Sequence, residues 1–214
     1  MDVYLSEEER VEALKKWWKE NARAVITGIA IGIAILVGWN TWQGAKIRKS
    51  QEASDLYQQL VKAVEAKQAD PATKLAERIV QQHQGSRYST YASLFQAKLK
   101  ADANDFAPAK NILGDLLNAE KDPRLQHIIR LRLARVLQAT NDHEGALKLL
   151  EPIAAKDSGD FEKIYEDHKG DSYLALNRTD DARRAFTKAK ELGLESSLLV
   201  IKLNNLGGPE TEQP

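Results

Sequence analysis

One stretch of this sequence carries no charged residue, although charges are frequent in the rest of the chain. There are 31 basic and 31 acidic residues among 214, yet residues 24–45, between Arg23 and Lys46, contain none. A helix of these 22 residues rises about 33 Å, and the hydrocarbon core of a bilayer is about 30 Å thick. Because a backbone in lipid must satisfy its own hydrogen bonds, we predict that residues 24–45 form a transmembrane helix.

All four tryptophans stand near the ends of this segment, with Trp17 and Trp18 before it and Trp39 and Trp42 towards its close. Indole rings favour the headgroup layers of a bilayer, so the four residues are predicted to be interfacial anchors. Two other interpretations fit less well. Apolar runs in buried core helices are usually about 10–14 residues long. A cleavable signal peptide would be followed by small residues at its cleavage site, where this chain has bulky ones.

The basic residues that flank the span predict its orientation. Lys and Arg close to a span favour the cytoplasmic side, and five precede it whereas three follow it. We therefore expect the N-terminus in the cytoplasm and the C-terminal part across the membrane, which in a Gram-negative bacterium is the periplasm. The absence of cysteine is compatible with an oxidising compartment but does not require one. The flanking residues are Arg10, Lys15, Lys16, Lys19 and Arg23 before the span, and Lys46, Arg48 and Lys49 after it.

The long segment after the span contains an internal repeat. Alanines recur at intervals of 37, 37 and 36 residues, and the positions four residues after and twelve residues before each alanine recur with them. Helical spacing dominates, and alternating strand patterns are missing. We predict an all-α solenoid of about four helical hairpins closed by a capping helix at about residues 196–206. The repeated positions are Ala72, Ala109, Ala146 and Ala182; Ala76, Leu113, Leu150 and Phe186; and Leu60, Ala97, Ala134 and Gly170.

The repeat unit resembles the tetratricopeptide repeat, in which small residues let two helices approach closely. The last unit matches best, through Gly170, Tyr173, Ala182, Phe186 and Ala189. The units are longer than the family's and lack its tryptophan, so a helical bundle without repeats stays open as an alternative. The predicted organisation is a cytoplasmic amphipathic segment, a transmembrane helix, a tetratricopeptide-like periplasmic domain and a disordered tail. Their boundaries are 1–23, 24–45, 46–206 and 207–214.

The sequence offers no convergent group of catalytic residues. Its four histidines are at least 16 residues apart and form no zinc-binding pair, and phosphate-binding glycine motifs are also missing. Each histidine is interpreted as a surface or packing residue. The net charge of +0 argues against the basic surface of a nucleic-acid-binding protein. We therefore expect a binding protein, with no enzymatic activity, metal or cofactor.

Two candidate interaction surfaces emerge. Gly28 and Gly32 are spaced so that a partner helix could pack closely against the span. Seven large residues on the first helices of the hairpins could form an apolar groove for extended or partly unfolded polypeptide. A register error of one residue would instead place them in the core, and this alternative stays open. The groove candidates are Tyr57, Val61, Tyr91, Leu94, Ile128, Leu131 and Ile164.

The opening YLSEEERVEALKKWWKEN, the glycine-rich span, the repeats and the closing IKLNNL together resemble the YfgM-like ancillary subunits of the bacterial Sec translocon. The match covers essentially residues 3–206; Ala22 departs from it, where the family often has glycine. The resemblance implies an inner-membrane protein that associates with the SecYEG channel and with a membrane-anchored periplasmic prolyl isomerase chaperone. It also implies help in passing emerging polypeptides to periplasmic folding factors. A different class of function, an assembly scaffold for cytochrome maturation or cell-wall synthesis that binds only folded partners, stays open.

Overall fold

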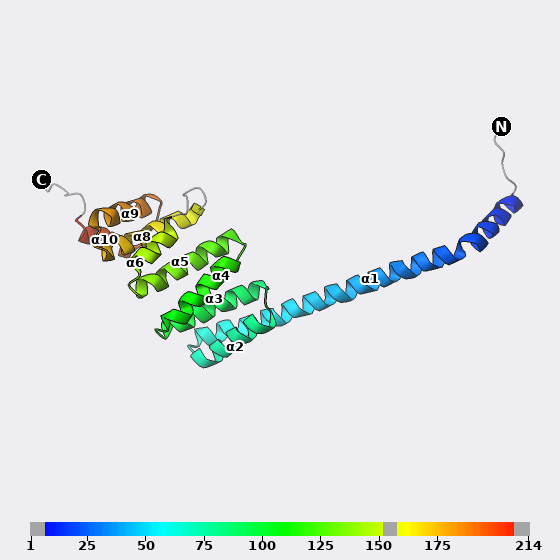
Figure 1. Cartoon of the computed structure of the whole chain (residues 1–214), viewed down its shortest axis with the longest axis horizontal. Coiled ribbons are helices and arrows are strands. Elements are labelled where there is room, and N and C mark those ends of the chain that lie inside the picture. The colour runs from blue at the N-terminus through cyan, green and yellow to red at the C-terminus, as the bar shows by residue number, and fades with distance from the viewer. Residues whose placement is uncertain (1–6, 152–157, 208–214) are drawn as a thin grey trace, which may run out of the picture. The chain divides into compact units, whose positions relative to one another are not determined.

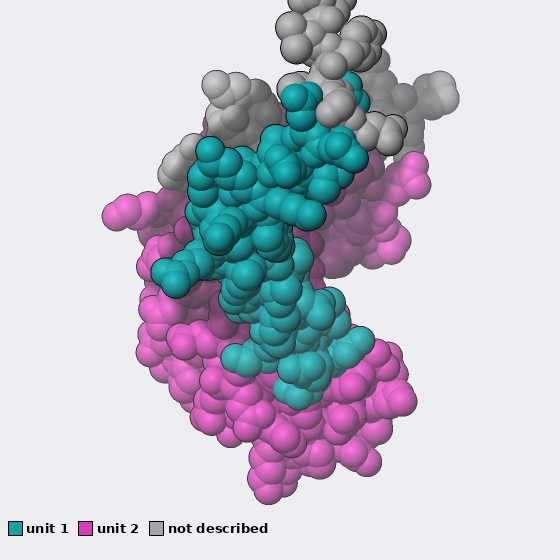
Figure 2. All heavy atoms as spheres, turned by 90° about the vertical axis from the view of Figure 1, so that its right-hand side faces the viewer, with its two compact units in different colours: residues 1–52 teal, residues 53–214 magenta. Residues whose placement is uncertain are grey.

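The computed structural model describes residues 7–151 and 158–207. Two compact units make up the chain, residues 1–52 and residues 53–214 (Figure 2, teal and magenta). The described parts contain nine α-helices and one short 3-10 helix, so the predicted all-α class is confirmed. The predicted disordered tail lies outside the described residues from residue 208 onwards.

The first helix, α1 (Glu7–Glu65), is continuous for 59 residues. It therefore contains residues 7–23 of the predicted amphipathic segment, the predicted span and the start of the repeats without a break. Two threonine side chains within the apolar stretch bond to the backbone of the helix itself. Thr27 Oγ1 donates to the carbonyl of Arg23 (2.7 Å), and Thr41 Oγ1 donates to the carbonyl of Val37 (2.9 Å).

Helical hairpins form the second unit, and successive helices pack on their neighbours in the sequence (Figure 1). The first helices of the hairpins are the end of α1, then α3 (Arg87–Asp102), α5 (Pro123–Ala139) and α8 (Glu162–Ala175). The second helices are α2 (Ala69–Gln82), α4 (Phe106–Ala119), α6 (His143–Leu150) and α9 (Thr179–Glu191). The 3-10 helix η1 (Gly159–Phe161) precedes α8, and α10 (Ser197–Asn205) follows the last hairpin.

Each hairpin turns at a residue with left-handed backbone. These residues have φ between 55° and 60° and recur at the spacing of the alanines. The next backbone N–H donates to a carbonyl five residues back, at 2.8–2.9 Å, which closes the helix end. Asparagine tolerates this conformation better than most residues, and it occupies three of the four positions. The four turn residues are Lys67, Asn104, Asn141 and Asn177.

The seam between the two helices of each hairpin is filled by residues of complementary size. The position twelve residues before the repeated alanine shrinks along the chain from leucine to glycine, while the position four residues after it grows from alanine to phenylalanine. All eight residues are buried. A Cβ atom on Gly170 would lie 2.4 Å from the ring of Phe186, so that hairpin requires glycine. The pairs are Leu60 and Ala76, Ala97 and Leu113, Ala134 and Leu150, and Gly170 and Phe186.

Helix α10 packs on the last hairpin as the predicted cap. Leu199 is buried in one cluster with Ala182, Phe186 and Ala189. The helix starts at Ser196, whose side chain accepts a hydrogen bond from the backbone N–H of Leu199. The cap thus covers the apolar side of α9 that the end of the solenoid would otherwise expose.

Candidate protein-interaction surface

The first helices of the hairpins carry the groove residues predicted from sequence, and these residues are unequally accessible. Leu94 and Leu131 are only 6% and 8% exposed and belong to the central core cluster. They therefore offer little surface to a partner. Half-buried positions are held by Tyr57, Val61, Tyr91, Ile128 and Ile164. The groove as a binding surface remains a prediction, and its accessible part consists of these five residues.

Aromatic rings gather at the first two hairpins. The ring of Tyr57 lies 5.7 Å from that of Tyr88, 5.8 Å from Tyr91 and 6.0 Å from Phe95, measured between centroids. Partial burial raises the pKa of the Tyr57 hydroxyl, and the neighbouring Tyr91 raises it further. Half-buried aromatic rings combine apolar area with a polar tip, which suits contact with another protein.

The groove predicted from sequence contains no charged residue, although the repeat spacing places charged residues at equivalent positions of the later hairpins. Lys98, Arg135 and Asp171 occupy in later hairpins the position that Val61 occupies in the first, at the same spacing as the repeated alanines. The face therefore changes from apolar and aromatic in the first hairpin to charged in the last.

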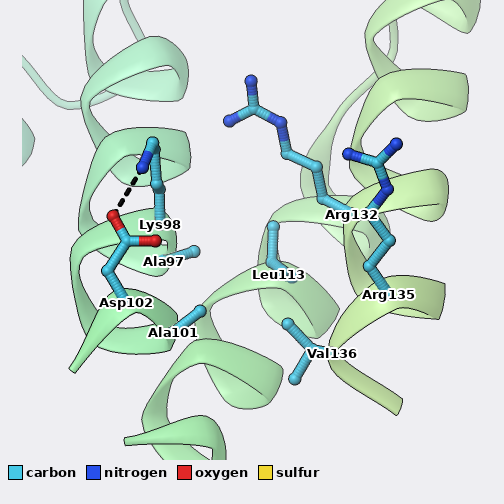
Figure 3. A pocket seen from close by; sticks show the side chains of 8 residues that line it. All are labelled: Ala97, Lys98, Ala101, Asp102, Leu113, Arg132, Arg135 and Val136. Carbon is cyan, nitrogen blue, oxygen red and sulfur yellow. Dashed lines mark hydrogen bonds and ion pairs between the residues drawn. The ribbon is translucent and has the colours of Figure 1, made fainter. Parts of the chain in front are cut away.

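A cavity of about 350 Å³ opens between α3, α4 and α5 (Figure 3). Lys98 forms an ion pair with Asp102 on one side. On the other side, Arg132 donates from Nη1 to the carbonyl of Leu94 (3.3 Å), and Arg135 donates from Nε to Nε2 of His168 (3.2 Å). The apolar lining consists of Ala97, Ala101, Leu113 and Val136.

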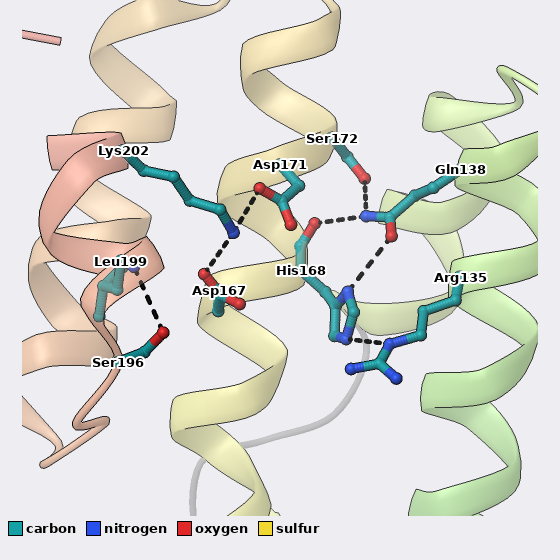
Figure 4. A network of polar contacts seen from close by, with 9 residues as sticks. All are labelled: Arg135, Gln138, Asp167, His168, Asp171, Ser172, Ser196, Leu199 and Lys202. Carbon is teal, nitrogen blue, oxygen red and sulfur yellow. Dashed lines mark hydrogen bonds and ion pairs between the residues drawn. The ribbon is translucent and has the colours of Figure 1, made fainter. Parts of the chain in front are cut away.

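A buried polar network joins α5 to α8 (Figure 4). Gln138 donates from Nε2 to the carbonyl of His168 (2.7 Å) and to Oγ of Ser172 (2.8 Å), and its Oε1 lies 3.2 Å from His168 Nδ1. Burial, together with the charge of Arg135, lowers the pKa of His168 to about 4. The imidazole is therefore neutral near pH 7, with Nδ1–H as donor and Nε2 as acceptor from Arg135.

The cap helix α10 places one lysine against two carboxylates of α8, the first helix of the last hairpin. Nζ of Lys202 lies 2.8 Å from Asp167 and 2.7 Å from Asp171. Burial alone would lower the pKa of Lys202, but its hydrogen bonds to the two carboxylates raise it overall. Lys202 thus compensates part of the negative charge of Asp167 and Asp171 from within the chain.

The buried histidines have packing roles. Nδ1 of His127 lies 2.7 Å from the hydroxyl of Tyr165, and its ring stacks on Phe161 with 5.0 Å between centroids. Across residues 7–151 and 158–207, no three His, Cys, Asp or Glu side chains are placed to hold a metal ion.

The first unit presents its apolar side chains outward. One segment of α1 is long and apolar enough to cross a membrane. The tryptophans form two pairs, with 6.5 Å between the centroids of Trp17 and Trp18 and 5.3 Å between those of Trp39 and Trp42. Their role as interfacial anchors stays a prediction. A Cβ atom added at Gly28 or Gly32 would meet nothing within 4 Å, so that face of the helix is open.

Comparison with known proteins places the fold in a class. Residues 15–208 match the tetratricopeptide repeat-like domain family. Two solved structures share the fold at a TM-score of about 0.6: the Cut9–Hcn1 hetero-tetramer of the APC/C (TM-score 0.60, 22% identity, 72% of this chain and 29% of that one) and MamA from Desulfovibrio magneticus RS-1 (0.59, 14%, 74% and 83%). The protein is thus a tetratricopeptide-like helical repeat protein, and the alternative of a bundle without repeats is excluded.

Relatives of similar length narrow this class to a family. Ancillary SecYEG translocon subunits of Haemophilus influenzae and Escherichia coli K12 are 30% and 31% identical to this chain over 96% of its length, and the matches cover 100% and 99% of those proteins. The chain belongs to the family of ancillary SecYEG translocon subunits. The family resemblance predicted from the sequence is confirmed.

Proposed function

We propose that this protein is an ancillary subunit of a SecYEG translocon, held in the bacterial inner membrane by residues 24–45. In this proposal the N-terminus is cytoplasmic and the hairpins lie in the periplasm. The hairpin domain binds secreted polypeptides as they leave the channel and passes them to a membrane-anchored periplasmic prolyl isomerase chaperone. It works as a scaffold and performs no chemical step.

The observation that carries the proposal is the full-length match to SecYEG ancillary subunits, which includes both the apolar helix and the repeats. The apolar segment of α1 supports membrane anchoring. The half-buried aromatic residues on the first hairpins support binding to extended polypeptide, because they offer apolar contact area without a deep pocket.

If the hairpin domain is anchored next to a channel exit, weak contacts are enough for it to bind the emerging polypeptide. A tether restricts the binding domain to a small volume around the emerging chain, which raises the effective concentration of each for the other. A low intrinsic affinity then has a functional advantage, because the polypeptide must be released to a folding factor.

Site-specific photo-crosslinking in intact cells tests the proposal. A photoreactive amino acid at Tyr91, one of the half-buried groove residues, is expected to crosslink to nascent secreted polypeptides and to yield products with SecYEG subunits. The matched control is the same amino acid at Lys74, which is exposed on the outer helix α2 and should give few polypeptide adducts. Crosslinks from Tyr91 that are confined to folded envelope proteins would favour the assembly-scaffold function instead.

The open face of the span supports a proposal about where it contacts the translocon. Gly28 and Gly32 lie one helical turn apart with free space around both, so a partner helix could approach closely there. We expect Gly28→Leu with Gly32→Leu to reduce co-purification with SecYEG while membrane insertion is retained. Replacing Ile29 and Ile33 by leucine is the matched control. Equal recovery of SecYEG with both double variants would argue against this contact.

A further inference from the structure

Four aromatic side chains of the first two hairpins form a patch of neighbouring rings. Three of them stand on α3 at intervals of three and four residues, so they share one face of that helix. The fourth, Tyr57 on α1, has its ring within 6.0 Å of each of the other three, measured between centroids. All four side chains are half-buried, so each has a part in contact with the protein and a part open to a ligand. This aromatic patch consists of Tyr57, Tyr88, Tyr91 and Phe95.

Packing holds the rings of the aromatic patch in place. All of them except Tyr91 pack against a cluster of buried residues that includes Leu60. Tyr91 packs against the neighbouring cluster, which includes Leu94 and Leu131. Side chains that are already held by the core lose little conformational freedom when a ligand binds. The patch is therefore a pre-formed contact surface.

The aromatic patch also offers hydrogen-bond donors. Within residues 7–151 and 158–207, the hydroxyls of Tyr57, Tyr88 and Tyr91 form no hydrogen bond with another residue. In the last hairpin, by contrast, the hydroxyl of Tyr173 donates to Glu151 (2.9 Å). Partial burial and the neighbouring Tyr91 raise the pKa of Tyr57, so its hydroxyl stays protonated. A ligand with unpaired carbonyl groups can accept hydrogen bonds from these hydroxyls.

Among extended chains, a polyproline II helix matches these properties best. Its carbonyl groups have no internal partners, and proline has no N–H group that would need an acceptor in the site. Two residues of such a helix advance about 6.2 Å, which is close to the 5.7 and 5.8 Å that separate the ring of Tyr57 from those of Tyr88 and Tyr91. Because its conformation is restricted before binding, it also loses less entropy than a flexible chain.

We propose that the aromatic patch binds proline-rich segments of polypeptides in the polyproline II conformation. Pyrrolidine rings of the segment lie against the rings of Tyr57 and Tyr91, and the tyrosine hydroxyls donate to its carbonyl groups. Contacts of this kind depend on backbone shape, so they select a class of segment and not one sequence. The inference rests on the proposed function in one respect, namely that the hairpin domain binds polypeptides, and it names the kind of segment that is bound.

Peptide binding to the full chain in lipid nanodiscs tests the inference. The probe is fluorescein-labelled hexaproline with a C-terminal amide, followed by fluorescence anisotropy. We expect it to bind about tenfold or more tightly than hexaproline made of D-proline, which has the same composition but winds in the opposite sense. An amidated Gly-Ser-Ala-Gly-Ser-Ala peptide, which is flexible and has N–H groups, should bind as weakly as the D-proline peptide.

Protein variants assign the effect to the aromatic patch. Tyr91→Phe keeps the ring and removes one donor, so we expect the affinity for hexaproline to fall about fivefold. Tyr91→Ala removes ring and donor and should abolish the preference for L-proline. The matched control, Tyr173→Phe, removes a hydroxyl in the last hairpin and should leave binding unchanged. Circular dichroism melting confirms that each variant is folded.

Equal binding of the two hexaprolines, or a preference for L-proline that survives in folded Tyr91→Ala, would overturn the inference. An unchanged affinity in Tyr91→Phe would overturn the role of the hydroxyl. Equal binding of the Gly-Ser-Ala peptide would overturn the assignment to proline-rich segments. Co-purification of the unmodified chain with SecYEG is measured in parallel. If the preference for L-proline is absent while co-purification persists, only the inference fails; if co-purification is absent, the proposed function fails.

Discussion

The two units of this protein use the same apolar residues in opposite ways. Ile33 and Ile35 in the first unit are 57% and 65% exposed, whereas Ile79 and Ile129 in the second are fully buried. In the second unit the gain from removing apolar side chains from water is realised by packing against other helices. Among the described residues of the first unit these side chains have no such packing, and the predicted bilayer would supply the apolar surroundings instead.

Polar groups show the same contrast. In the first unit Thr27 and Thr41 bond to carbonyls one turn back in their own helix. In the second unit polar side chains bridge different helices, as Gln138 does from α5 to α8 and Lys202 from α10 to α8. These bonds of the first unit are local to one helix, whereas those of Gln138 and Lys202 depend on correct tertiary contacts. Substitutions should therefore affect insertion in one unit and folding in the other.

The largest expected effect is on folding of the second unit. Phe186→Ala removes a fully buried ring that packs against Gly170, and we expect the free energy of unfolding to fall by about 4 kcal/mol. The matched change in the first unit, Leu36→Ala, should leave the unfolding transition unchanged. Urea denaturation in detergent micelles, followed by circular dichroism, checks both. A similar loss in the two variants would remove the distinction between the units.

A charged residue introduced into the first unit should disfavour its insertion into the membrane. Ile33→Arg places a charge near the middle of the apolar segment, which we expect to disfavour insertion by about 3 kcal/mol. Carbonate extraction should then release a substantial fraction of the protein, while Ile33→Leu should remain in the membrane. The urea transition of the hairpins should be the same in both. Full membrane retention of Ile33→Arg would indicate that this segment does not cross lipid.

Lowering the pH should destabilise the second unit through protonation of His168. Because its pKa is about 4 when folded against 6.5 when free, the unfolded chain binds a proton first as the pH falls. Stability should therefore decrease between pH 6.5 and pH 4, by about 3 kcal/mol for this group. His168→Gln should flatten the dependence, whereas His83→Gln should keep it. Identical pH profiles for the two variants would show that a group other than His168 causes the loss of stability at low pH.

The smallest expected effect concerns a turn, where the substitution should stabilise the protein instead of destabilising it. Lys67 has φ of 55°, a conformation that costs a residue with a Cβ atom about 1 kcal/mol. Lys67→Gly should therefore raise the free energy of unfolding by up to about 1 kcal/mol. Asn104→Gly should raise the free energy of unfolding by less, because asparagine already tolerates the left-handed conformation. A loss of stability in Lys67→Gly would show that the lysine side chain contributes contacts that outweigh the strain.

Much of the fold could be predicted from the sequence because the signals are periodic. The spacing of Ala72, Ala109, Ala146 and Ala182 located all four hairpins, and those alanines are fully buried. The sequence could have predicted the continuity of α1, because no proline interrupts Glu7–Glu65; what local patterns cannot show is where the predicted span ends and the helix of the repeat domain begins.

The site was less predictable. Leu94 and Leu131 occupy the repeat position that half-buried Tyr57 holds in the first hairpin, and only the packing of the helices around them shows that they are buried. The network at His168 joins residues 30 or more positions apart, which no local pattern contains. Arg132 and Arg135 look like ordinary solvated charges in sequence; their hydrogen bonds to Leu94 and His168 are visible only in the tertiary structure.

The most direct test of the account combines carbonate washing of membranes with mass spectrometry of the recovered protein. We predict that the full chain, including residues 24–45, stays in the washed membrane fraction, and that protease added to the periplasmic side digests the hairpin domain. Recovery of a water-soluble product that lacks the first forty or so residues would contradict the account.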